Sequence, residues 1–318
     1  MVLEFRQDPT KKTEIIFSTE RARRPQVFGA GGEEKKKCPF CRGSEAMTPP
    51  TTFARPSAVE WKVRCFRNAF PLLSPVKPYA GPVGPAFGDH EVIVETEEHG
   101  ALFQDLSEAQ LALVMEAYKN RFRTIGSREG IACVYLFKNH GRAAGASIEH
   151  EHAQIVGLPF VPELLQRELD AFDSFAAENR KCFYCSFAER EGENLLEEND
   201  SFAAYCPSFA RFPAEVWVVA KRHFTTLLDL APAEEKDLMA VLTSCVKKVY
   251  EKAGHDYVIA FHCAPAGRDF HFHAEIYPRT NIWAGLELGA GLVVNTKSEK
   301  DALKELKAEP EEEFVGVK

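Results

Sequence analysis

The sequence predicts an α+β fold made of two similar halves, each with an antiparallel sheet and flanking helices. Its 318 residues are 45% hydrophobic and 27% charged, which is enough for two cores of about 150 residues each. Short apolar segments of strand length alternate with a few longer amphipathic segments. A series of Cys and His motifs also occurs twice in the same order, which predicts an internal duplication.

In the first half we expect several strands and one long helix. The helix begins at Glu108 after the cap residue Ser107, continues to about Ile125 and is ended by Gly126. Its apolar residues recur every three or four positions, which is the helical period. The other expected elements are strands over residues 14–17, 90–95 and 131–137, a strand running into a turn over 61–73, a turn over 138–141, and a strand over the His150-x-His152 motif.

The second half repeats this order. Its expected elements are a helix over residues 163–175, strands over 215–219 and 257–261, a long helix from Pro232 to just before Gly254, and a second His-x-His motif at His271. Pro near the start of a helix and Gly past its end follow the known preference of helix termini. We therefore expect one unit over residues 1–175 and another over residues 176–318.

Each half contains two Cys in a C-x-x-C pair and two His, a complete Cys₂His₂ set for a structural zinc ion. A redox role for the pair at Cys38 is disfavoured, because such a motif belongs between a strand and a helix, whereas Gly43 and a Thr-Pro-Pro segment follow here. The predicted zinc sites are Cys38, Cys41, His99 and His150 in the first half, and Cys182, Cys185, His223 and His271 in the second.

Composition excludes several classes of function. The formal net charge of −8 opposes a nucleic-acid binder, which needs a basic face. No apolar run has the length needed to cross a bilayer, and the N-terminus lacks a signal pattern. Nine cysteines, four of them in C-x-x-C pairs, favour metal binding in a reducing compartment over disulfides. We expect a cytoplasmic protein.

His152 is the imidazole that remains after the metal set has taken His150. Residues two apart on a strand share a face, so His150, His152 and Gln154 should project together. A histidine held through one ring nitrogen can present the other as a nucleophile toward phosphorus. The small residues Gly145 and Ser147 nearby let backbone N–H groups approach phosphate oxygens.

These residues together resemble the galactose-1-phosphate uridylyltransferase family of the histidine triad superfamily. The similarity extends over nearly the whole chain. It rests on Cys38-Pro-Phe-Cys41, Thr48-Pro-Pro50, Asn68-Ala-Phe70-Pro71, Asn139, Ser147, His150-x-His152-x-Gln154, Phe209-x-x-Phe212-Pro213-x-Glu215-Val-Trp217, Lys221-Arg-His223 and Gly285-Leu-Glu287.

The resemblance implies two fused histidine-triad-like motifs and ping-pong transfer of a nucleotide. His152 would take UMP from UDP-glucose, release glucose 1-phosphate and pass UMP to galactose 1-phosphate, assisted by Gln154. It also implies a homodimer whose active sites use both subunits. The implied ligand contacts are Arg21, Arg24, Asn68, Phe70, Asn139, Gly145 and Ser147 for the nucleotide and phosphates, and Glu287 and Asn281 for the hexose. An alternative iron site, known in some relatives, would use Glu168, His262 and His273.

The chain departs from the family pattern at several positions. Glu151 stands where a proline is common, Ala69 replaces a charged residue, and Asn281 and Leu286 replace a lysine and a tyrosine of the hexose site. An ADP-sugar phosphorylase or adenylyltransferase of the same superfamily therefore stays open as an alternative. A zinc-stabilised nucleotide-binding module without catalysis is the alternative of another class. Because Glu275 replaces Gln154 in the second motif, we expect catalysis only in the first half.

Overall fold

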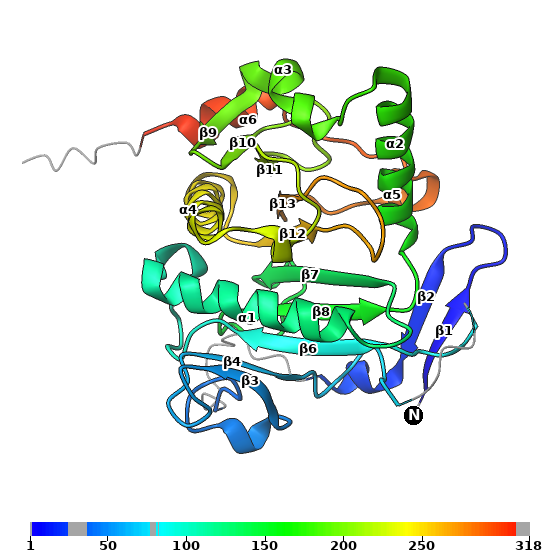
Figure 1. Ribbon diagram of the computed structural model, residues 1–318, viewed down its shortest axis with the longest axis vertical. Coiled ribbons are helices and arrows are strands. Elements are labelled where there is room, and N and C mark those ends of the chain that lie inside the picture. The colour runs from blue at the N-terminus through cyan, green and yellow to red at the C-terminus, as the bar shows by residue number, and fades with distance from the viewer. Residues whose placement is uncertain (1, 25–36, 77–80, 82, 310–318) are drawn as a thin grey trace, which may run out of the picture.

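A computed structural model describes residues 2–24, 37–76, 81 and 83–309 (Figure 1). Its centre is one ten-stranded antiparallel sheet. In spatial order the strands are β3 (Thr51–Arg55), β4 (Val63–Arg67), β6 (Asp89–Val94), β8 (His152–Leu158), β7 (Cys133–His140), β12 (Tyr257–His262), β13 (His273–Pro278), β11 (Val216–Ala220), β10 (Phe202–Tyr205) and β9 (Leu195–Glu198).

The sheet has an internal two-fold relation. Read from its two edges, the first five strands and the last five follow the same order, with β8 matching β13 and β7 matching β12. The halves join where β7 pairs antiparallel with β12, with Phe137 opposite Ala260. The duplicated α+β fold with antiparallel sheets is thus confirmed. The sequence did not indicate that the two sheets are continuous, because an apolar strand carries no mark of which neighbour it will pair with.

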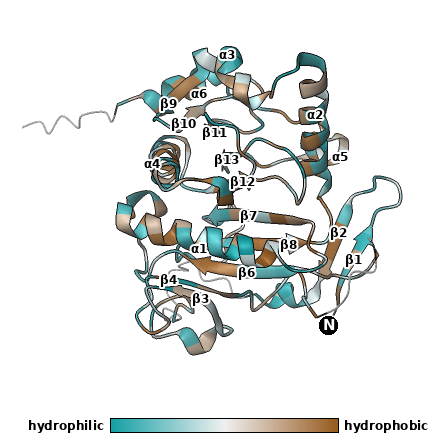
Figure 2. Cartoon of the chain, viewed as in Figure 1, coloured by the Kyte–Doolittle hydropathy of each residue, from teal (hydrophilic) through white to brown (hydrophobic). Residues whose placement is uncertain are grey.

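Two long helices cover one face of the sheet, one from each half (Figure 1). They are α1 (Glu108–Gly126) and α4 (Pro232–Lys248), and they begin at the predicted residues. Ser107 Oγ accepts a hydrogen bond from Gln110 N, as expected for an N-cap. α1 carries hydrophilic and hydrophobic turns in alternation (Figure 2), and its apolar side enters a core shared by both helices and both halves.

The opposite face of the sheet carries most of the remaining elements. They are a small sheet of β2 (Glu14–Ser18), β1 (Leu3–Gln7) and β5 (Gly84–Pro85), the helices α2 (Glu163–Asn179), α3 (Phe187–Glu191) and α5 (Gly285–Ala290), and several short 3₁₀ turns. Three smaller apolar clusters lie between these elements and the strands. The last helix, α6 (Glu299–Lys307), instead packs Ala302 and Leu306 into the main core on the side of α4. The expected boundary after residue 175 lies inside α2, whose Leu169 and Phe172 pack with residues of the second half.

Two local predictions were wrong near the main motif. Strand β7 continues through residues 138–140, where we expected a turn, because pairing of His140 with Tyr257 extends it. Strand β8 begins only at His152, so His150 lies just before the strand. Within the part of the chain that the structure describes, no helix is both long and apolar enough to span a bilayer.

Candidate active site and metal centres

His152, the first residue of β8, has the arrangement that a nucleophilic imidazole needs. Its Nδ1 lies 2.8 Å from the carbonyl oxygen of His150, so Nδ1–H donates there and the Nε2 lone pair is left free. The ring is 7% exposed and contacts Phe40 edge-on, with ring centroids 5.1 Å apart. Burial lowers the pKa of His152 to about 4, so the imidazole is neutral at pH 7 and able to attack.

A cavity of about 530 Å³ opens beside this ring. Most of its surface is apolar, with a few polar groups, as is typical of a nucleotide or cofactor pocket. It is lined by Arg24, Lys37, Pro39, Phe40, Met47, Thr48, Phe66, Asn68, Ala69, Phe70, Val92, Gly145, Ser147, Ile148, His152 and Gln154. Seven of the eleven predicted catalytic, nucleotide and hexose residues therefore meet in one place.

The two predicted arginines reach this region from the 3₁₀ turn Thr19–Arg23 and the residue that follows it. Arg21 donates to the carbonyl of Phe70 at 2.9 Å, and Arg24 lies 3.4 Å from the carbonyl of Gly145. Burial lowers the pKa of Arg21, but the guanidinium stays charged. Arg24 thus lines the cavity beside Gly145, and Arg21 holds the backbone of Phe70, which lines it as well. Positive charge at this place suits the phosphates of a nucleotide.

Besides Arg21, three predicted residues do not line the cavity. Asn139 lies on β7, one residue beyond the Lys138–Ala153 pair, so register places it opposite His152 on the same face. Asn281 follows β13, and Glu287 caps the N-terminus of α5 by accepting from Ala284 N at 3.0 Å. Both belong to the second half and are separate from this chain's His152 cavity.

Sequence reasoning missed His90 on β6. Its Nε2 lies 3.0 Å from Gln154 Oε1, and its Nδ1 lies 3.1 Å from Leu72 N. The register pairs Val92 with Gln154, so a polar residue two positions before Val92 shares the face of Gln154. The alternation of β6 therefore contained the signal, although only knowledge of the pairing makes it visible.

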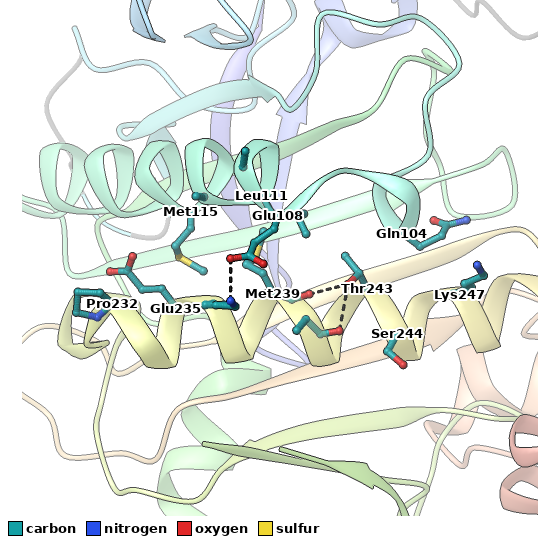
Figure 3. A pocket seen from close by; sticks show the side chains of 14 residues that line it. Gln104, Glu108, Leu111, Met115, Pro232, Glu235, Met239, Thr243, Ser244 and Lys247 are labelled. Carbon is teal, nitrogen blue, oxygen red and sulfur yellow. Dashed lines mark hydrogen bonds and ion pairs between the residues drawn. The ribbon is translucent and has the colours of Figure 1, made fainter. Parts of the chain in front are cut away.

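A larger groove of about 780 Å³ lies on the other face of the sheet, between α1 and α4 (Figure 3). Its floor includes Leu111, Met115 and Met239, and an ion pair of 2.8 Å between Lys236 and Glu108 crosses its rim. None of the described residues that line it is His or Cys. We therefore place the chemistry at the smaller cavity around His152.

The first predicted zinc set comes together as expected. The donor atoms of Cys38, Cys41, His99 and His150 all lie within 4.8 Å of one another. Cys41 Sγ is 3.4 Å from His99 Nδ1 and 3.6 Å from His150 Nδ1, close to the roughly 3.5 Å that tetrahedral zinc imposes on S and N ligands. His150 Nε2 donates to Thr96 O at 2.8 Å, which leaves Nδ1 free to bind metal.

The second set repeats this geometry. Cys182 Sγ lies 3.4 Å from His271 Nδ1, and Cys185 Sγ lies 3.4 Å from His223 Nδ1. His271 Nε2 donates to Ala220 O at 2.8 Å, as His150 does to Thr96. Burial raises the pKa of the Cys182 thiol to about 12, so these thiols become thiolates only beside a cation. Donor chemistry and spacing in both sets fit zinc.

Comparison with models of known protein families shows to which family the chain belongs. The model of the N-terminal domain of galactose-1-phosphate uridyl transferase matches residues 4–162, and that of its C-terminal domain matches residues 166–312. The chain belongs to the galactose-1-phosphate uridyl transferase family. Members of this family are nucleotidyltransferases, so the chain is an enzyme of that class.

Individual relatives carry two different names. ADP-glucose phosphorylase from Arabidopsis thaliana is 29% identical, covering 95% of this chain and 91% of the relative. Galactose-1-phosphate uridylyltransferase from Thermotoga maritima is 28% identical, covering 96% and 98%. Among solved structures, the Arabidopsis phosphorylase with bound ADP-glucose has a TM-score of 0.82 at 28% identity, covering 98% of this chain and 99% of that one. A uridylyltransferase structure has a TM-score of 0.79 at 27% identity, covering 96% and 97%.

The position that matches His152 in the second half is enclosed. His273 stacks on Tyr184 and Trp217, with ring centroids 4.4 and 5.3 Å away. Its Nε2 lies 3.1 Å from Glu168 Oε1 and 3.4 Å from Glu275 Oε1. Burial alone would lower the pKa of His273, but the two carboxylates raise it to about 9. A protonated imidazole between carboxylates has no lone pair for phosphorus.

His262 completes a third group of possible metal ligands in this enclosed region. The donor atoms of Glu168, His262, His273 and Glu275 lie within 4.8 Å of one another. Glu168 accepts from His262 Nδ1 at 2.7 Å. Arg211 also pairs with Glu275 at 2.8 Å. Two carboxylates and two imidazoles are ligands that iron or zinc accepts.

Glu151, the unusual middle residue of the His-x-His motif, lies in a buried ionic cluster on the α1 side of the sheet. Its carboxylate pairs with Lys138 Nζ, which also pairs with Glu95, and with His140 Nδ1 at 2.7 Å. Burial would raise the pKa of Glu151, but Lys138 and His140 lower it to about 2. Tyr118 OH donates to Glu95, so the second carboxylate is also satisfied. Glu151, which stands where a proline is common in the family, is thus stabilised by its ion pair with Lys138.

Proposed function

We propose that this enzyme transfers a nucleoside monophosphate from a nucleoside-diphosphate sugar to a phosphate acceptor through a covalent intermediate on His152. The supporting observation is a neutral, buried imidazole whose Nε2 is free and borders the nucleotide-sized cavity. The Nε2 lone pair attacks the α-phosphorus, and the bond to the bridging oxygen breaks, releasing a sugar 1-phosphate. A phosphate oxygen of the acceptor then attacks the same phosphorus and the P–N bond breaks, restoring His152.

In the specific reaction proposed, UDP-glucose donates UMP, glucose 1-phosphate leaves and galactose 1-phosphate accepts. Arg21 and Arg24 hold phosphate charge, and Ser147 and the backbone at Gly145 contact the phosphate region. Asn68 and Phe70 form the nucleoside side of the cavity. Gln154 donates a hydrogen bond to the transferring phosphoryl group. Its amide cannot act as an acid or base that activates water, which favours transfer over hydrolysis.

The hexose contacts proposed for Glu287 and Asn281, and part of the phosphate contact proposed for Asn139, complete the substrate site. Since Glu287 and Asn281 lie apart from this chain's cavity, we propose that they serve the cavity of a partner subunit in a homodimer. Sedimentation at several concentrations should give a dimer. A monomer at all concentrations would leave the hexose contacts unassigned.

ADP-glucose phosphorolysis is the second candidate reaction, because the Arabidopsis ADP-glucose phosphorylase covers nearly the whole chain at 29% identity. In that case inorganic phosphate replaces the hexose 1-phosphate as acceptor. The nucleoside side of the cavity offers Phe66, Phe70 and Val92, apolar side chains against which either base can pack. Labelling with each of the two donors distinguishes these bases.

We propose zinc at both Cys₂His₂ sets, where it stabilises the loops that carry the ligands. Iron at Glu168, His262 and His273 is the alternative. A cytoplasmic location agrees with the nine cysteines, all of which are unpaired by disulfides.

The deciding experiment incubates the protein with UDP-glucose or ADP-glucose labelled in the α-phosphate, without acceptor. We expect acid-labile, base-stable label on the chain, and none on His152→Ala. Addition of galactose 1-phosphate or inorganic phosphate should then remove the label from the chain, which identifies the acceptor. A wild-type protein unlabelled by both donors would support the non-catalytic nucleotide-binding module instead.

A further inference from the structure

His90 lies between a backbone N–H group and the side-chain amide of Gln154, and it contacts each of them through one ring nitrogen. Its ring is 2% exposed, lies on β6 beside β8, and contacts Gln154 Oε1 through Nε2 and Leu72 N through Nδ1. A backbone N–H can only donate, so Nδ1 must be the accepting nitrogen. In a neutral imidazole the proton then sits on Nε2.

The neighbouring groups agree with this tautomer. Burial lowers the pKa of His90 to about 3, and the positive charges of Arg21 and Arg24 act in the same direction, so the ring is neutral. Asn68 Oδ1 accepts from Phe70 N at 2.9 Å, which orients its Nδ2 toward His90 Nε2 at 3.3 Å. Because both of these nitrogens carry protons, that last contact is not a hydrogen bond. The proton on Nε2 is therefore donated to Gln154.

The direction of this donation determines what Gln154 presents to a ligand. Its Oε1 is occupied by His90 Nε2–H, so its NH₂ group is the end left for the cavity. A phosphoryl oxygen can only accept, and an amide turned the other way would place a carbonyl oxygen against it. Gln154 itself cannot choose between the two orientations, which have nearly the same shape.

We propose that His90 is a positioning residue that fixes the amide orientation of Gln154, so that its NH₂ faces the phosphoryl group during nucleotide transfer. The proposal rests on the proposed function of His152. It assigns to the backbone N–H of Leu72 the role of selecting the tautomer. The predicted cost of losing the contact is that of one neutral hydrogen bond, about a three- to tenfold lower rate of transfer.

Two substitutions separate the two nitrogens of the ring. His90→Asn places an amide oxygen near the Nδ1 position and can still accept from Leu72, but it does not reach Gln154. His90→Gln places an NH₂ near the Nε2 position and can still donate to Gln154. The measurement is the single-turnover rate of label transfer to the chain, together with KM for the donor. His255→Asn, an exposed position outside the cavity, is the matched control.

We expect His90→Asn to lower the single-turnover rate about three- to tenfold with little change in KM, and His90→Gln to recover most of it. In a Gln154→Ala background, His90→Asn should have no further effect, since the group it positions is gone. Equal losses with and without Gln154, or no recovery by His90→Gln in a variant of wild-type melting temperature and zinc content, would overturn the proposal. Absence of label on the wild-type chain would instead reject the proposed function.

Discussion

Lys138 is the residue on which the buried charges near the motif depend. It is fully buried, as are Glu95 and Glu151, the two carboxylates that it joins. Burial lowers its pKa, but the carboxylates outweigh this effect and raise it, so Lys138 is charged in the fold. Two carboxylates on one ammonium are tolerable only because Tyr118 and His140 supply further hydrogen bonds.

Lys138→Met should therefore be strongly destabilising, although the two side chains have similar volumes. It leaves two buried carboxylates without their cation, for which the expected loss is about 3–5 kcal/mol in the free energy of unfolding. Urea unfolding followed by tryptophan fluorescence measures this loss. Lys62→Met on the exposed surface is the control and should change stability by less than about 0.5 kcal/mol. A loss below about 1 kcal/mol for Lys138→Met would show that the cluster is not a coupled ion group.

At the residue scale, the sequence predicted which residues come together where a motif recurs, and it missed contacts that depend on strand register. The donors of both candidate metal sets lie close together, as the repeated C-x-x-C and His-x-His motifs and the matching positions of His99 and His223 predict. His90 was missed because it follows no motif. The sequence does not explain Glu151, because it predicts a turn at Lys138, whereas Lys138 lies within β7 and faces Glu151.

At the scale of elements, the packing of β8 under α1 leaves no room for a side chain at Gly157. A Cβ there would lie 2.4 Å from Ile125 Cγ2 and 3.3 Å from Ile131 Cδ1. Because Gly157 has no side chain, α1 can approach β8 closely at this point. Gly88, on the neighbouring chain segment, would place a Cβ 2.3 Å from the carbonyl oxygen of Gly157.

We expect Gly157→Ala to cost about 1–3 kcal/mol of stability, because the branched side chain of Ile125 must move within a packed core. The melting temperature and the urea midpoint should both fall. Gly192→Ala is the matched control, since a Cβ there meets nothing within 4 Å and the backbone is helical. A wild-type midpoint for Gly157→Ala would mean that α1 and β8 separate readily.

Element types were predictable because period and end signals agree along most of the chain. The long helices start at Glu108 and Pro232 as the capping residues indicate, and β12 begins at Tyr257. Strand ends were less predictable, since pairing partners decide them: β7 is prolonged by β12, and β8 is shortened by the bend that carries His150 to the cysteines.

The whole molecule consists of two related halves. Both halves keep a Cys₂His₂ set, but they differ in the surroundings of the second histidine of the His-x-His motif. One half places a free imidazole beside a cavity, and the other encloses His273 between carboxylates and aromatic rings. Because a single core includes residues of both halves, loss of the metal at either site should lower the stability of the whole fold.

Cys38→Ser and Cys182→Ser should each lower the zinc content from about two ions per chain to about one, measured by elemental analysis. Each should also lower the melting temperature while leaving one cooperative transition, since the core is shared. Cys206→Ala, a buried cysteine outside both sets, should keep two ions. Separate melting transitions for the two halves would contradict a shared core.

The junction of β7 with β12 also has a consequence during synthesis. The strands of the first half can pair as soon as β8 leaves the ribosome, but the free edge of β7 waits for Tyr257 and its neighbours to be made. At about 5–20 residues per second, that delay is roughly 5 to 20 s. For that time the nascent chain carries an unpaired strand edge, a surface on which other nascent chains can assemble. Translation speed across the second half is thus part of what determines the yield of this protein.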